Sequence, residues 1–312
     1  MNLLSEFPLV VIVGPTASGK STLGVWLAQQ LDGEVIACDS TQLYRGFDVG
    51  TAKPTDQEKS GVPHHLLDVL DSSEETTAGA YRERAIIALS DLRTRKKLPI
   101  LTAGTGLYLR ALLEGFAEVP RRSEGLRDRL RASAAEHGRG HLHQILKKLD
   151  AVSADKIAAT DEQKLIRAIE VCLLAKQPLS RVHETGRAPL VGWRAIKVGL
   201  NPRRDDLYER IHGRTDAMLQ RGWLEEVREL VESGVAEKAK PFDFIGYREL
   251  RKVLRGEMGM EQARVEIQQA TRRYAKRQLT WFRREAGVQW LEGFGDDAEI
   301  QRQALVKVRG AL

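Results

Sequence analysis

The stretch LVVIVGPTASGKSTL, residues 9–23, decides the fold. Leu9–Val13 is a short, apolar, β-branched run that ends at a glycine, which is typical of a buried parallel strand entering a turn. A helix is predicted from Ser21 to Leu31, directly after the turn. The sequence therefore predicts a strand, a glycine-rich loop and a helix in immediate succession.

The loop between this strand and helix satisfies the Walker A pattern of two glycines, a lysine and a hydroxyl. Its glycines allow backbone N–H groups and the helix N-terminus to face an anion, and the lysine adds a positive charge. We expect the loop to bind a di- or triphosphate through Gly14, Pro15, Thr16, Ala17, Ser18, Gly19, Lys20 and Ser21. The hydroxyl of Ser21 is the expected Mg²⁺ ligand, which makes Mg²⁺ the predicted cofactor.

Further predicted strands alternate with helices, as in a doubly wound α/β sheet. Glu34–Ala37 and Leu98–Thr102 are predicted as the second and third strands, with a helix at Ala78–Lys96 between them, and Trp193–Leu200 is predicted to return to the sheet. Long amphipathic helices are predicted at 207–233 and 260–285. The predicted fold is an α/β, P-loop NTPase-like, doubly wound parallel sheet with an inserted all-helical domain and C-terminal helices.

Three segments organise the chain. Residues 1–119 form the first part of the α/β core, 120–195 form a helical insert rich in charge, and 196–312 return to the core and end in basic helices. The length of 312 residues fits one large domain or two modest ones. No internal repeat or low-complexity tract interrupts this plan.

Composition limits the classes of protein. Apolar residues make up 42% and charged residues 29%, as in ordinary globular proteins. Lys and Arg exceed Asp and Glu by 49 to 43, which permits a polyanionic partner. The two cysteines are too few for a disulfide framework or a cysteine-based zinc site, and no apolar run is long enough to cross a membrane. A cytoplasmic location without membrane contact is expected.

Residues that follow neighbouring parallel strands should share one crevice beyond the carboxyl ends of the sheet. Asp39 follows the second strand and Thr105 the third. Asp39 is a candidate general base, with a helix cap or a water-mediated Mg²⁺ ligand as alternatives. Thr105 lies in AGTGLYLRALLEG, where its alternative role is to cap the next helix. His64 and His65 are adjacent and are expected to be structural or pocket-lining, because in an extended segment they would face opposite sides.

The segment TRRYAKRQLTWFRRE, residues 271–285, predicts a helix with two faces. Ile267, Ala270, Tyr274 and Trp281 line one side, and the opposite side carries Arg273, Lys276, Arg277, Thr280 and Arg284. A solvated basic helix is the plain interpretation. Beside a phosphate loop, the alternative is a surface that grips an RNA backbone.

The chain resembles the tRNA dimethylallyltransferase, or isopentenyl-tRNA transferase, family in its compact bacterial form. The segments GPTASGKS, DSTQLYRG, DVGTAKP, GVPHHLLDV, AGTGLYLRALLEG, RAIEV, IGYREL and TRRYAKRQLTWFRR are similar to successive motifs of that family, in order. The resemblance implies transfer of a dimethylallyl group from dimethylallyl diphosphate to N6 of the adenine 3′-adjacent to the anticodon, in the anticodon stem-loop of tRNAs that read codons starting with U. The product would be N6-isopentenyladenosine.

The resemblance also assigns roles to the residues of this chain that occupy matching motif positions. The resemblance implies Asp39, Thr105 and Arg214 as catalytic residues, with Arg214 on the diphosphate side. It also implies a set of tRNA contacts, namely Asp39, Ser40, Thr41, Gln42, Thr105, Arg127, Gln163, Lys164, Leu165, Ile166, Arg167, Asp243, Phe244, Ile245, Gly246, Tyr247, Arg248, Lys276, Arg277, Gln278, Leu279, Thr280, Trp281, Phe282 and Arg283. The chain departs from the family pattern at Cys38, at Ala103 and at the bulky Phe242 and Phe244. A monomeric enzyme is expected.

Three rival functions remain at this stage. A P-loop kinase for a small molecule would use the loop for ATP and Asp39 as its base, although no acidic residue closes the strand in PILTAG as an ATPase would normally require. An adenylate-directed prenyltransferase would have less use for the helical insert. An RNA-binding protein with an inactive loop would bind tRNA without turnover.

Overall fold

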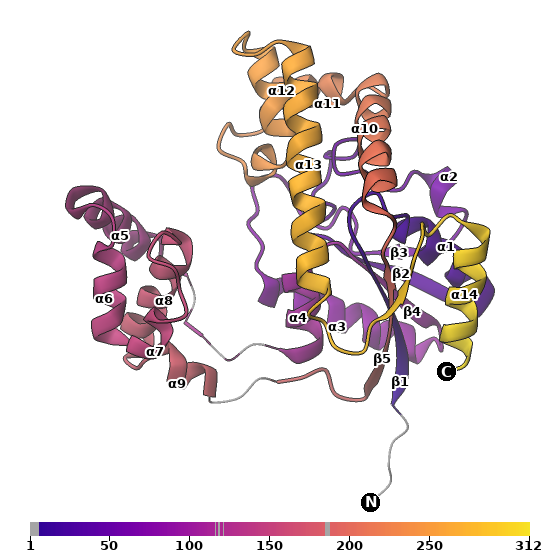
Figure 1. The fold of residues 1–312 in the computed structure, drawn as a ribbon, viewed down its shortest axis with the longest axis horizontal. Coiled ribbons are helices and arrows are strands. Elements are labelled where there is room, and N and C mark those ends of the chain that lie inside the picture. Colours follow the sequence, from indigo (N-terminus) through magenta and orange to yellow (C-terminus); the bar gives the residue numbers. More distant parts are fainter. Residues whose placement is uncertain (1–5, 116, 118, 121, 185–187) are drawn as a thin grey trace, which may run out of the picture. The chain divides into compact units, whose positions relative to one another are not determined.

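The computed structural model describes residues 6–115, 117, 119–120, 122–184 and 188–312, and the other positions of the predicted 1–119 and 120–195 segments lie outside the described residues. Its centre is a mixed α/β unit with a six-stranded, all-parallel sheet in the order β3-β2-β4-β1-β5-β6 (Figure 1). The strands are β1 (Phe7–Val13), β2 (Gly33–Cys38), β3 (His64–His65), β4 (Leu98–Ala103), β5 (Trp193–Leu200) and β6 (Gln289–Leu291). The four strands predicted from sequence are confirmed, and β3 and β6 are additional.

Strand β1 lies in the middle of the sheet, between β4 and β5. Leu9 to Val13 are all fully buried, as expected for a strand covered on both faces. Val10 and Ile12 share an apolar cluster with residues of α1 (Lys20–Leu31) and α14 (Ala298–Arg309), including Leu23 and Ile300. The other face is covered by α3 (Ala78–Thr94), whose Tyr81 hydroxyl donates to the carbonyl of Ala37 at 3.1 Å. The layers are therefore helix, sheet and helix.

The helices around the sheet begin and end at recognisable signals. The Thr77 hydroxyl accepts the N–H of Ala80 and starts α3, which ends at Thr94, two residues before the predicted end. A capping box at Thr55 starts the short α2 (Asp56–Lys59). Helix α4 (Gly106–Glu114) follows β4 after a two-residue connection.

A set of helices stands beyond the carboxyl ends of the strands (Figure 1). These are α10 (Arg204–Gln220), α11 (Trp223–Glu232), the 3-10 turn η1 (Lys240–Asp243), α12 (Tyr247–Leu254) and α13 (Met260–Phe282). The prediction of one helix over 207–233 is wrong, because Gly222 adopts a left-handed conformation with φ of 93° and separates α10 from α11. The predicted helix at 260–285 is confirmed as α13, which ends at Phe282.

The chain divides into two compact units. One comprises the chain up to Leu112 together with Val191–Leu312, and the other comprises Leu113–Leu190. The second unit contains α5 (Glu124–His137), α6 (His141–Leu149), α7 (Ala151–Ala154), α8 (Glu162–Ala175) and α9 (Leu179–Glu184). Its core includes Leu130, Leu146 and Ile169. The unit boundaries fall at 112/113 and 190/191, where the sequence predicts 119/120 and 195/196.

Within the described part of the chain, no helix combines the length and apolar character needed to span a bilayer.

A buried carboxylate ties the edge of the sheet together. Glu34 on β2 has a side chain that is only 6% exposed, and its oxygens contact the Arg95 guanidinium and, at 2.7 Å, Nε2 of His65. The hydrogen bonds from Arg95 are the main reason that the pKa of Glu34 is lowered from 4.5 to about 2. The histidine pair is thus structural, with Nδ1 of His64 held against the carbonyl of Val62.

This network predicts a pH-dependent contribution to stability. Because the folded-state pKa is lowered, the contribution is present above pH 4.5 and is lost as pH falls toward 2. We expect Glu34→Gln to reduce the free energy of unfolding by about 2 kcal/mol at pH 7, and by much less near pH 2, as measured by urea denaturation. Glu83→Gln, at an exposed position on α3, is the matched control and should change little. A loss that is equal at both pH values would contradict the assignment.

Candidate active site

The loop after β1 forms a backbone cradle at the start of α1. Gly19 adopts a left-handed φ of 86° and lets the chain turn into the helix at Lys20. The Lys20 ammonium donates to the carbonyls of Gly14 at 3.0 Å and Pro15 at 2.7 Å, which folds its side chain back over the loop. The Ser18 hydroxyl is fully buried and has no hydrogen-bond partner among the described residues. A loop of this shape exposes positive charge to an anion.

The C-terminal part of the chain braces this loop. The N–H of Gly295, between β6 and α14, donates to the carbonyl of Ser18 at 2.9 Å. A Cβ atom at Gly19 would lie 2.7 Å from the nitrogen of Gly295, so both positions require glycine. Beside them, Arg210 of α10 forms a bidentate ion pair with Asp296. The segment between β6 and α14 therefore holds the loop in place, and Arg210 of α10 holds that segment.

Asp39 and Thr105 follow adjacent strands and lie side by side, as the strand order requires. Oδ1 of Asp39 accepts the Thr41 backbone N–H at 2.9 Å and the Thr41 hydroxyl at 2.7 Å. Oδ2 lies against Gly104, where an added Cβ would stand 2.1 Å away. The Thr105 hydroxyl accepts the N–H of Ser40 at 3.0 Å, so Thr105 steadies the Asp39 turn through its neighbour.

The segment after this turn is anchored to α11. The carboxylate of Glu226 accepts the backbone N–H groups of Asp48 at 2.9 Å and Val49 at 2.7 Å. The ammonium of Lys53 is only 5% exposed and contacts the carboxylates of Asp48 and Asp68. These contacts fix Thr51, which forms part of the cavity wall.

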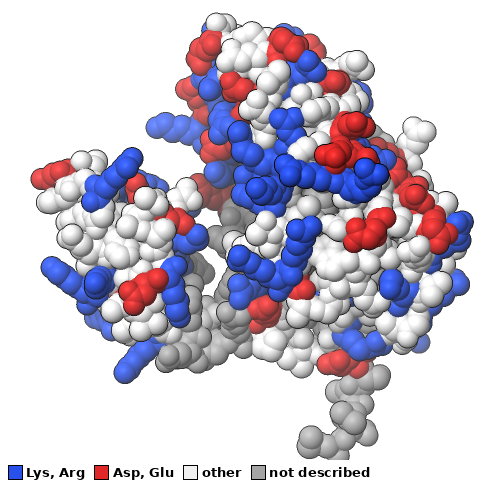
Figure 2. All heavy atoms as spheres, in the orientation of Figure 1, with Lys and Arg blue, Asp and Glu red and all other residues white. Residues whose placement is uncertain are grey.

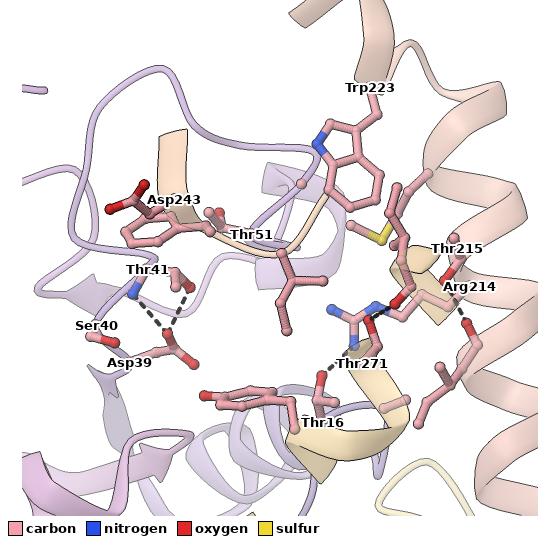
Figure 3. Close-up of a pocket in the computed structure, with 18 of the residues that line it drawn as sticks. Thr16, Asp39, Ser40, Thr41, Thr51, Arg214, Thr215, Trp223, Asp243 and Thr271 are labelled. Atoms are coloured by element: carbon pink, nitrogen blue, oxygen red, sulfur yellow. Dashed lines mark hydrogen bonds between the residues drawn. The ribbon is translucent and has the colours of Figure 1, made fainter. Parts of the chain in front are cut away.

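Two connected chambers open beside Asp39. The loop chamber, of about 590 Å³, is lined by Lys20, Ser21, Arg210 and Asp296 among others. The apolar chamber, of about 310 Å³, is lined on one side by Ile211, Trp223, Phe244, Ile245 and Ile267. Both are lined by Thr16, Ala17, Asp39, Thr51, Arg214 and Met218. Asp39 and the loop Gly14–Ser21 therefore border one continuous cavity, into which Thr16, Asp39, Arg214 and Trp223 project (Figure 3).

Two cations, Lys20 and Arg214, line the loop chamber together with Asp39. Burial lowers the pKa of the Lys20 ammonium from 10.5 to about 7, although the Asp39 carboxylate opposes this shift. Burial also lowers the pKa of Arg214, whose guanidinium is 3.5 Å from the Thr16 hydroxyl. Two desolvated cations near one carboxylate favour a bound polyanion.

Helix α13 has a buried face that reaches the loop. Oε1 of Gln278 accepts the Thr16 N–H at 2.7 Å, and Nε2 of Gln278 donates to the carbonyl of Gly104 at 2.7 Å. Ile267 and Ala270 are buried, whereas Trp281, which the pattern places with them, is 38% exposed. Among the predicted tRNA contacts at 276–283, Gln278 and Phe282 are buried, Leu279 is half-buried, and Lys276, Arg277, Thr280, Trp281 and Arg283 are exposed. Figure 2 shows Lys and Arg side chains gathered over the course of α13 on the viewed face.

The predicted contacts at 243–248 lie at the apolar chamber and behind it. Asp243, Phe244 and Ile245 line the chamber, Gly246 and Tyr247 are buried behind it, and Arg248 is exposed. The unusual phenylalanines pack on aromatic neighbours, Phe242 on Phe47 and Phe244 on Tyr44, each with ring centroids 5.7 Å apart. Gln42 lines the loop chamber and donates to the carbonyls of Thr51 and Ala52.

The predicted contacts in the helical unit divide by exposure. Gln163 and Lys164 are exposed on α8, whereas Leu165 and Ile166 belong to the apolar core of the unit. The buried carboxylate of Glu170 accepts a 2.6 Å hydrogen bond from Arg167 and lies 3.6 Å from Arg127. Both arginines are therefore partly neutralised within the unit.

The sequence model of the IPP transferase family matches residues 42–285. The chain belongs to this family. It is 49% identical to a tRNA dimethylallyltransferase of Koribacter versatilis over 97% of this chain and 98% of that protein. It is 47% identical to a tRNA dimethylallyltransferase of Solibacter usitatus over 96% of this chain and 98% of that one.

Solved structures of family members share the fold. A tRNA isopentenylpyrophosphate transferase of Bacillus halodurans is 36% identical, with a TM-score of 0.71 and 98% of each chain covered. A eukaryotic dimethylallyltransferase, solved in crystallographic snapshots of its action on tRNA, is 26% identical with a TM-score of 0.82, and 97% of this chain and 77% of that chain are covered.

Sequence reasoning missed several residues of the cavity. Met218, Trp223 and Ile267 form its apolar wall, and Thr51 and Lys53 line the loop chamber. Tyr274 and Gln278 stand four residues apart on α13, so they share one face. That spacing is the signal that could have placed Gln278 on the buried side.

The lowered pKa of Lys20 predicts a proton-coupled anion site. The free ammonium loses its proton near pH 7, and a bound anion raises its pKa again. We therefore expect inorganic diphosphate to bind more weakly as pH rises above 7, with uptake of a proton that calorimetry in buffers of different ionisation enthalpy detects. Lys20→Met should lose this uptake. Lys307→Met, on α14, should retain it, and uptake that persists in Lys20→Met would refute the assignment.

Proposed function

We propose that this protein transfers the dimethylallyl group of dimethylallyl diphosphate to N6 of an adenine in tRNA. The acceptor is the adenine 3′-adjacent to the anticodon of tRNAs that read codons starting with U, and the product is N6-isopentenyladenosine. The observation that carries the proposal is the continuous cavity bordered by Asp39 and the loop Gly14–Ser21. Membership of the IPP transferase family and the names of the relatives agree with it.

The donor diphosphate fits the loop chamber. The loop backbone and the Lys20 ammonium would hold the phosphates, and Arg214, which lines the same chamber, would stabilise the charge that the leaving group gains. The donors near the loop include the oxygen atoms of the exposed Ser21 hydroxyl and of Thr102, which suit Mg²⁺. The described residues contain no cluster of three acidic, histidine or cysteine ligands. Bound Mg²⁺ would neutralise part of the diphosphate charge.

The acceptor chemistry needs a base beside the nucleophile. The exocyclic amine of adenine is a poor nucleophile because its lone pair is delocalised into the ring. Oδ2 of Asp39 would accept the N6 proton, since Oδ1 is engaged by Thr41. The bond from C1 of the donor to the diphosphate oxygen breaks, the bond from C1 to N6 forms, and the proton passes to Asp39. Thr105 supports this geometry through Ser40.

The exposed basic residues indicate where tRNA would bind. The exposed Lys276 and Arg277 on α13 and Arg283 directly after it give the α/β unit a cationic face. Gln163 and Lys164 are exposed on the helical unit. The adenine must leave the stacked anticodon loop to enter the cavity, so base flipping is part of the proposal. A monomeric enzyme is part of the proposal. Cys38 and Cys172 are unpaired, which fits a reducing cytoplasm.

One assay distinguishes this function from its rivals. Labelled dimethylallyl diphosphate and Mg²⁺ are incubated with tRNA, with AMP or without an acceptor, and the label should appear only on tRNA. Label on AMP would indicate an adenylate-directed prenyltransferase. Binding of tRNA without transfer would indicate an inactive RNA-binding protein, and phosphate transfer from ATP would indicate a kinase.

The role of Asp39 predicts a separation of binding from chemistry. Asp39→Asn retains the shape of the side chain but cannot accept the N6 proton, so we expect transfer to slow by about 100- to 10,000-fold. Affinity for tRNA, measured by gel shift, should change by less than about threefold, because the cationic face is untouched. Asp56→Asn, on α2 and outside both chambers, is the control. Undiminished transfer in Asp39→Asn would eliminate it as the base.

A further inference from the structure

Trp223 closes one side of the apolar chamber. It is the first residue of α11, directly after the left-handed turn at Gly222, and it is only 2% exposed. Its indole projects toward the space between Thr51 and Arg214 (Figure 3). The segment between α10 and α11 is thereby shaped to place a large aromatic ring at the cavity wall.

Two glycines fix the position of this indole. A Cβ atom at Gly50 would stand 2.0 Å from its Nε1, and one at Gly246 would stand 1.9 Å from its Cζ2. Tyr247 packs edge-on against the ring, with centroids 5.8 Å apart. The indole therefore has little room to swing aside and enlarge the chamber.

Hydrogen bonding does not explain why tryptophan stands here. Its Nε1 is buried and has no hydrogen-bond partner among the described residues. Leaving an indole N–H unpaired costs free energy that a phenylalanine would avoid. The size and shape of the ring are thus the properties that the site uses.

The proposed reaction places the donor chain against this wall. In-line displacement requires the leaving oxygen at the loop, C1 of the donor and the adenine N6 beside Asp39 to lie roughly on one line. The remaining carbons of the prenyl group must depart from that line. The wall formed by Met218, Trp223, Ile245 and Ile267 offers them an apolar surface next to the loop.

We propose that Trp223 sets the length of the prenyl donor and confines it to one isoprene unit. This inference rests on the proposed function. A longer donor such as geranyl diphosphate carries the same reacting carbon and the same leaving group, and its additional isoprene unit would meet the indole. The bonds made and broken are those of dimethylallyl transfer, so only the fit of the chain changes.

The test compares two donors in the same enzyme. For the wild type and for Trp223→Ala, kcat/KM is measured with dimethylallyl and with geranyl diphosphate, tRNA being the acceptor. The geranyl to dimethylallyl ratio is the readout, because it is independent of the fraction of active enzyme. We expect the ratio to rise at least about tenfold in Trp223→Ala, since a lost or gained methylene in an apolar pocket is already worth about that much. The ratio should rise less in Trp223→Leu and least in Trp223→Phe.

A matched substitution controls for loss of an indole elsewhere. Trp26 on α1 packs against the sheet core and lines neither chamber, so Trp26→Leu should leave the ratio unchanged. If the wild type fails to transfer dimethylallyl to tRNA, the proposed function itself fails. If the wild type transfers it and the ratio stays flat in Trp223→Leu and Trp223→Ala, only the inference about Trp223 is overturned. If Trp223→Ala folds poorly, the geranyl to dimethylallyl ratio of Trp223→Leu tests the inference in its place.

Discussion

A single buried amide holds the site together. The side chain of Gln278 accepts the N–H of Thr16 in the loop after β1 and donates to the carbonyl of Gly104 just past the end of β4. Because these groups are shielded from water, each bond left unpaired would carry the full cost of desolvation. The amide thus fixes the distance between the loop and Gly104, against which Asp39 lies. It also holds α13 against both segments.

The position of α13 also explains how one helix can serve two purposes. Its inward side meets the loop through Gln278 and the sheet unit through Phe282, which is fully buried. Its outward side carries the exposed Lys276 and Arg277, and Arg277 also lines the apolar chamber. Helix α13 therefore fixes the position of the cationic surface relative to the apolar chamber, because it contributes residues to both.

Much of this arrangement can be predicted from local sequence. The run Leu9–Val13, the glycine loop and the four main strands have patterns that depend only on near neighbours, and the convergence of Asp39 with the loop follows from the rule that parallel strands end at one edge. The break at Gly222 was missed because the amphipathic period continues across it. The two-residue strand β3 owes its existence to pairing with β2, which no local pattern encodes. Trp223 and Thr51 line the cavity because chain segments distant in sequence meet there. The burial of Gln278 could not be predicted from its residue type, because glutamine is usually found on the surface.

The brace between Ser18 and Gly295 bears on how the site comes into being during synthesis. The cradle is made near the beginning of the chain, yet the backbone that supports it is near the end. The central strand β1 must likewise wait for β5 before both of its edges are paired. A nascent chain emerging from the ribosome therefore carries an unbraced loop until β6 and α14 have docked. Assembly of the cradle is in this way coupled to the late synthesis of residues 289–309.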